Sequence, residues 1–68
     1  MNEETLNLSI RKFLKIVGVS SQREIEQAVD KAVAAGHEGT SEAFPATMTL
    51  EIPGLKLRVT FEGEILLG

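Results

Sequence analysis

The stretch LKLRVTFEGEILL, residues 55–67, alternates apolar residues with others without interruption. Alternate residues of an extended chain point to the same side, so this stretch predicts a β-strand with one apolar face. That face consists of Leu55, Leu57, Val59, Phe61, Gly63, Ile65 and Leu67. The stretch is about twice as long as a typical strand of 5–6 residues, so it needs a long partner in a chain of 68 residues.

The preceding residues 44–52, FPATMTLEI, show the same period of two and are followed by Pro53-Gly54, a turn signal. We expect an antiparallel hairpin in which Ile52 pairs with Leu55 across a two-residue turn, although an L-proline-glycine turn twists less favourably than the turns that hairpins prefer. This register places every apolar residue on one face. The other face then presents Thr47, Thr49, Glu51, Lys56, Arg58 and Thr60 to water.

The predicted register leaves part of the last strand without a partner. Phe44 lies opposite Gly63 in it, so Glu64–Leu67 extend beyond the first strand. One solution is a second turn at Glu62-Gly63-Glu64 that folds residues 65–67 back as a third strand. We favour the second solution, in which the strand continues straight and pairs with the same strand of a second copy in a homodimer. An edge left unpaired would be free to pair with strands of unrelated chains. The residues expected to mediate self-association are Phe61, Gly63, Ile65, Leu66 and Leu67.

Helical periodicity precedes the hairpin. The first helix is predicted from Glu3 to Val17, with Asn2 as its N-cap and Gly18 as its end. Its apolar stripe is Leu6, Ile10, Phe13, Leu14 and Val17. The sequence Ser21-Gln22-Arg23-Glu24 has the spacing of a capping box and predicts a second helix that ends at Gly36. The second stripe is Ile25, Ala28, Val29, Ala32 and Val33, and residues 36–43 are predicted to form a loop.

Composition limits the classes of function. The chain contains no cysteine and one histidine, which excludes disulfides, thiolate ligands and histidine clusters. Its net charge of −3 offers no general attraction to nucleic acid or to anionic lipid. The acidic, polar start Met1–Thr5 lacks the pattern of a secretory signal, and no apolar run approaches membrane-spanning length. We therefore expect a single cytoplasmic domain over residues 1–68, without a cofactor, a metal ion or a membrane partner.

Few side chains could perform catalysis. His37 follows a predicted helix end, where a histidine more commonly caps carbonyl groups, and Glu38 and Glu42 nearby do not complete a set of metal ligands. Glu62 and Glu64 point to the same side of the last strand, but on an exposed edge they more plausibly discourage wrong pairing. We therefore expect no catalytic residue and no enzymatic activity.

The order of two helices and a hairpin also resembles a winged helix-turn-helix, with the turn at Gly18–Ser21. The second helix would then read the major groove of DNA, but it carries Glu24, Glu26 and Asp30 against Arg23 and Lys31. These carboxylates would repel phosphates, which makes nucleic-acid binding the alternative and not the main hypothesis.

Residues 9–33, which contain SIRKFLKIVGVSSQREIEQAV, and the later segment FPATMTLEI resemble a family of short bacterial proteins of unknown function. This resemblance implies a small, free-standing cytoplasmic protein and assigns no site. The predicted fold class is α+β, with two helices packed on one face of the hairpin. The predicted function is that of a non-enzymatic protein-interaction module that forms a homodimer, with a further protein partner that the sequence does not identify.

Overall fold

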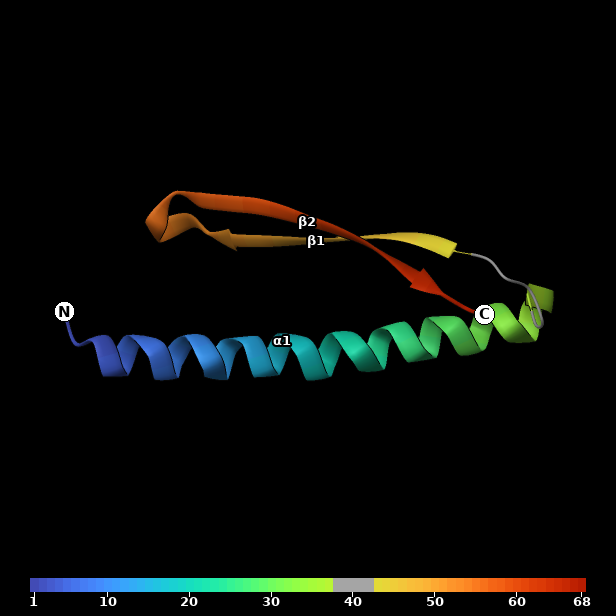
Figure 1. Cartoon of the computed structure of the whole chain (residues 1–68), viewed down its shortest axis with the longest axis horizontal. Coiled ribbons are helices and arrows are strands. Elements are labelled where there is room, and N and C mark those ends of the chain that lie inside the picture. Colours follow the sequence, from blue (N-terminus) through green and yellow to red (C-terminus); the bar gives the residue numbers. More distant parts are fainter. Residues whose placement is uncertain (38–42) are drawn as a thin grey trace. The chain divides into compact units, whose positions relative to one another are not determined.

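The computed structural model describes residues 1–37 and 43–68, and it has the predicted α+β composition. It consists of a helix, α1 (Glu3–Ala32), a short final turn, η1 (Val33–His37), and two strands, β1 (Ala43–Ile52) and β2 (Leu57–Leu66) (Figure 1). The chain divides into two compact units, one helical and one formed by the strands. Each unit is described by itself, and the packing of helix on hairpin stays a prediction.

The helical unit contains one helix where the sequence predicted two. α1 runs without interruption through Gly18 and Ser21, so the predicted break between them is wrong. Gly18 has no positive φ in the structure, and a helix needs such a conformation to end at a glycine. Glycine inside a helix costs only about 1 kcal/mol relative to alanine, which the turns on either side can offset.

Apolar positions continue in phase across the predicted break. Leu6, Val17 and Ala28 repeat every eleven residues, as do Leu14 and Ile25. Eleven residues make three turns of about 3.67 residues each, close to the helical repeat, so one straight stripe serves the whole of α1. A break at Gly18 would have interrupted this stripe.

Both ends of the helical segment agree with the sequence signals. The backbone N–H of Thr5 donates to Asn2 Oδ1 at 3.1 Å, which confirms Asn2 as the N-cap. Glu3 and Glu4 occupy the first turn, where negative charge is favourable. At the other end Gly36 has φ 107°, ψ 9°, a conformation that side chains disfavour, so the helical backbone ends there as predicted. The predicted loop residues 38–42 lie outside the described residues.

The hairpin closes through a longer turn than predicted. β1 and β2 are antiparallel, and Ile52 lies opposite Leu57, so the predicted pairing of Ile52 with Leu55 is wrong by two residues. The short turn η2 (Pro53–Leu55) is followed by Lys56, whose N–H donates to the carbonyl of Pro53 at 3.0 Å. Lys56 has left-handed φ 54°, ψ 36°. A four-residue connection thereby avoids the unfavourable twist of a two-residue L-proline-glycine turn.

The new register removes the unmatched tail. Phe44 lies opposite Ile65 and Ala43 opposite Leu66, so β2 is paired along its whole length within the chain. The third strand considered above does not form, because β2 continues straight through Gly63. The reason given for strand pairing across a dimer is therefore wrong, and self-association needs a different argument.

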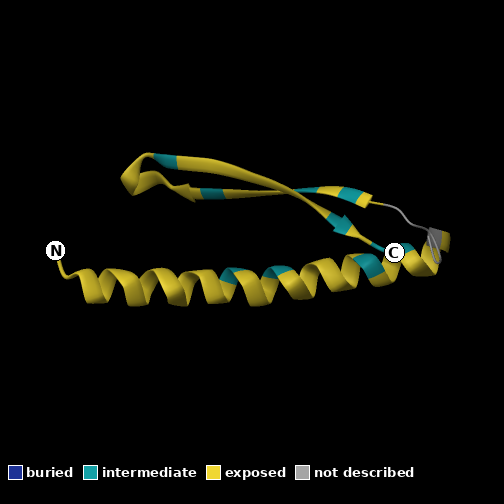
Figure 2. Cartoon of the chain, viewed as in Figure 1, coloured by how far each residue is buried: buried dark blue, intermediate teal, exposed yellow. Residues whose placement is uncertain are grey.

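No residue whose burial is described, in 1–36 and 43–68, is buried (Figure 2). Side chains predicted to form the core remain accessible, including Phe13 at 48% and Leu14 at 57%. Partly covered residues are Val17, Ser21, Val29, Ala32, Phe44, Ala46, Leu50, Leu57, Ile65 and Leu67. A lone helix and a lone pair of strands each expose most of their surface, so neither unit forms a core by itself.

The turn makes a testable prediction about stability. Asparagine tolerates the left-handed conformation better than other residues with a side chain, whereas a β-branched residue there is strained. We expect Lys56→Asn to raise the free energy of unfolding by about 0.5–1 kcal/mol, and Lys56→Val to lower it. Urea denaturation at one fixed protein concentration measures both. Equal stability of the two variants would contradict the left-handed turn.

Candidate interaction surface

One face of the hairpin is apolar along its whole length. Each residue of β1 on this face lies opposite another apolar residue or glycine of β2, because the two-residue difference in register preserved the alternation. The pairs are Phe44 with Ile65, Ala46 with Gly63, Met48 with Phe61, Leu50 with Val59 and Ile52 with Leu57. Met48 and Phe61, at the centre of this face, are 45% and 57% exposed. Within the hairpin unit, neither strand covers this face.

The opposite face is polar and internally matched. Thr49 and Thr60 lie opposite each other, and their hydroxyl oxygens form a hydrogen bond of 3.2 Å. In the predicted register, with Ile52 opposite Leu55, Glu51 would lie opposite Lys56. In the structure Glu51 lies opposite Arg58, which is also a pair of opposite charges. Lys56 belongs to the turn and not to this face. Sequence reasoning missed the Arg58 pairing because it assumed a two-residue turn.

The structure places four of the five predicted self-association residues on β2. Phe61, Gly63 and Ile65 lie on the apolar face, and Leu66 lies on the opposite face at the strand end, where it is 68% exposed. Leu67 follows the strand. The prediction that these residues mediate contact between two copies stays a prediction.

Two acidic residues considered for catalysis are exposed on the polar face. Glu62 lies opposite Thr47 and Glu64 opposite Pro45, so neither carboxylate faces another acid across the hairpin. The side chain of His37, and Glu38 and Glu42 entirely, lie outside the described residues. Within the part of the chain that the structure describes, no three potential metal-ligating side chains gather.

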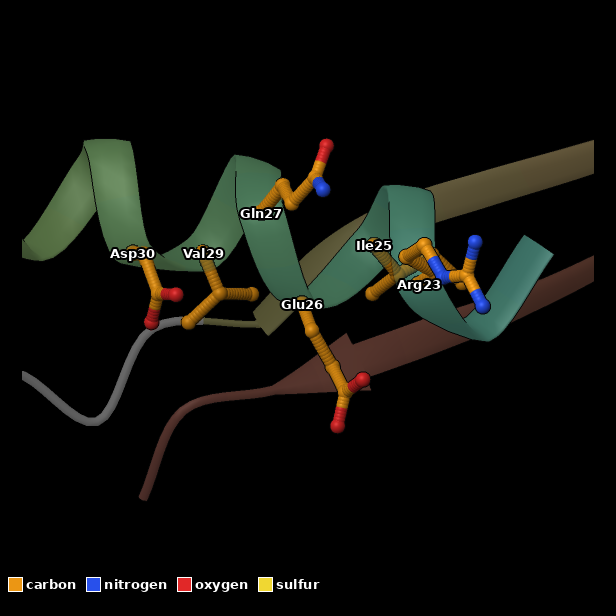
Figure 3. Close-up of a pocket in the computed structure, with 6 residues that line it drawn as sticks. All are labelled: Arg23, Ile25, Glu26, Gln27, Val29 and Asp30. Atoms are coloured by element: carbon orange, nitrogen blue, oxygen red, sulfur yellow. The ribbon is translucent and has the colours of Figure 1, made fainter. Parts of the chain in front are cut away.

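The helical unit has a depression whose described lining residues all belong to α1 (Figure 3). Its charged members are Arg23, Glu26 and Asp30, and the carboxylates of Glu26 and Asp30 extend from the same side of the helix. A single helix presents a convex surface and cannot surround a small molecule as a binding cleft does. In the described segments, no helix combines the length and the apolar composition of a membrane span.

These features define a small α+β protein with one long helix and one hairpin that has an apolar and a polar face. A family model described as a family of unknown function, DUF6494, matches residues 1–68, and the chain belongs to this family. The resemblance to a family of unknown function, noted from the sequence, is thereby confirmed. No curated protein and no solved structure matches the chain.

Proposed function

We propose that this chain is a non-enzymatic interaction module whose first partner is a second copy of itself. The observation that carries the proposal is the apolar face of the hairpin, on which apolar residues or glycine lie opposite one another along both strands. A two-stranded hairpin is at best marginally stable in water, and it becomes stable when further strands extend the sheet or a helix packs on its apolar face. A chain of 68 residues without cysteine has few other means to stabilise a fold.

The alternative function, nucleic-acid binding, loses its structural support. A winged helix-turn-helix requires a turn between two helices, whereas α1 is continuous from Glu3 to Ala32. The net charge of −3 also disfavours contact with phosphates. Interaction with protein surfaces is therefore the function that we propose.

Sedimentation equilibrium at micromolar concentration tests the proposal. We expect a particle of twice the chain mass of 7.4 kDa. We also expect a melting temperature that rises with protein concentration, since dilution favours the separated, less stable chains. A particle of single-chain mass that unfolds cooperatively, at a temperature independent of concentration, would show that the fold needs no second copy and would overturn the proposal.

A further inference from the structure

The two edges of the hairpin differ in their capacity to pair with another strand. Each edge of a two-stranded sheet leaves backbone donors and acceptors without a ladder partner. β1 contains Pro45, opposite Glu64. Proline has no N–H, and within a sheet it occurs where the missing donor faces outward. β2 (Leu57–Leu66) contains no proline, so its outer edge is the better template for an added strand.

We propose that β2 pairs antiparallel with β2 of a second copy, centred on Phe61, so that two hairpins form one four-stranded sheet. This inference rests on the proposed self-association and specifies its edge and register. Phe61 then lies opposite Phe61 of the second copy, Ile65 opposite Leu57, and Gly63 opposite Val59. Aromatic residues that face each other across strands stabilise a sheet, and the two apolar faces join into one.

The polar face is self-complementary in the same register. Arg58 lies opposite Glu64 of the second copy, and Thr60 lies opposite Glu62. Because Glu51 already lies opposite Arg58 within the hairpin, each Arg58 would stand between two carboxylates, one from its own chain and one from the other. Opposite charges across neighbouring strands are favourable, and two-fold symmetry repeats each pair.

Neighbouring registers are less favourable. A displacement of one residue brings the apolar residues of one copy beside the polar residues of the other. A displacement of two residues in one direction sets Glu62 opposite its own copy, and like charges in that position destabilise a sheet. A displacement of two residues in the other direction leaves a shorter paired segment, residues 57–63 of each copy. Centring on Phe61 pairs residues 57–65 of each copy.

Single cysteines test this register, because the natural chain has none. Residues directly opposite in an antiparallel pair have Cα atoms about 4.5–5.5 Å apart, within the range that a disulfide spans. We expect Phe61→Cys to form a disulfide-linked dimer under mild oxidation at least about tenfold faster than Val59→Cys. In the proposed register the two copies of residue 59 are offset by about 13 Å along the strands, too far for a direct disulfide.

A second experiment retains Phe61, since its removal weakens the contact being measured. A mixture of Val59→Cys and Gly63→Cys chains should cross-link to each other, and each alone should not. A natural chain that sediments as a dimer, with cross-links at residue 60, on β1 or without preference, would overturn the register and leave the proposed self-association standing. A natural chain that is monomeric would overturn both.

Discussion

Leu50→Asn is expected to lower the free energy of unfolding by about 2 kcal/mol or more, because it places an amide in the middle of the apolar face. Leu50 lies opposite Val59 and is already partly covered in the single chain. The proposed function requires that this face be covered, which pairing at the edge of β2 alone does not do. Once the face is covered, the variant loses the burial of a leucine and leaves polar groups without hydrogen bonds. Urea denaturation at a fixed protein concentration, combined with sedimentation, measures the loss of stability and of the dimer.

Thr47→Asn is the matched control for the same strand. Thr47 is exposed on the polar face opposite Glu62, and asparagine is a poor strand former at either position. We expect this variant to change stability by no more than about 1 kcal/mol, the span of strand propensity, and to remain dimeric. Equal effects of the two substitutions would show that the apolar face stays in water, which contradicts the proposed function.

The hairpin shows which features alternation encodes. Within the strands its apolar and polar faces were predicted correctly, because a period of two is unchanged when the register moves by two residues. Leu55 and Lys56, which were predicted to lie on these faces, belong to the turn instead. The residue pairs across the hairpin were predicted wrongly, because they depend on the length of the turn. The turn itself depends on the left-handed conformation of Lys56, which alternation of apolar and polar residues does not reveal. That single difference moved Ile65 opposite Phe44 and removed the unpaired tail.

The argument for the predicted self-association residues changes with the register. Phe61, Gly63 and Ile65 were predicted to pair across a dimer because β2 was too long for its predicted partner. In the structure β1 pairs with the whole of β2, and the three residues lie on the apolar face of the hairpin. Arg58 was not selected, although its cross-strand charge pairing can be derived from the sequence once a four-residue connection is assumed.

Helix signals were reliable at the ends and misleading in the middle. Asn2 and Gly36 mark the ends of the helical segment, as their sequence context predicted. Gly18 and the capping box after it did not produce an end, because each makes a boundary possible without requiring one. The apolar stripe that continues across Gly18 favours one helix, and it was divided between two predicted helices.

Substitutions at Gly18 should therefore have the signs expected of a helix interior. We expect Gly18→Pro to lower the free energy of unfolding by about 3 kcal/mol, because proline removes a hydrogen bond and clashes with the preceding turn. Gly18→Ala should raise it by about 1 kcal/mol, since a Cβ at this position meets no atom within 4 Å. Urea denaturation gives both values, and far-ultraviolet circular dichroism reports the loss of helix in the proline variant.

Gly36→Ala provides the contrasting case. Gly36 also has open space around its Cβ position, but its φ of 107° disfavours a side chain, so alanine there should destabilise. The two alanine variants should thus change stability in opposite directions, although both replace a glycine of the same helical segment. If Gly18 ended a first helix in a left-handed conformation, alanine would destabilise at both positions. That result would restore the two-helix arrangement and, with it, the turn that nucleic-acid binding requires.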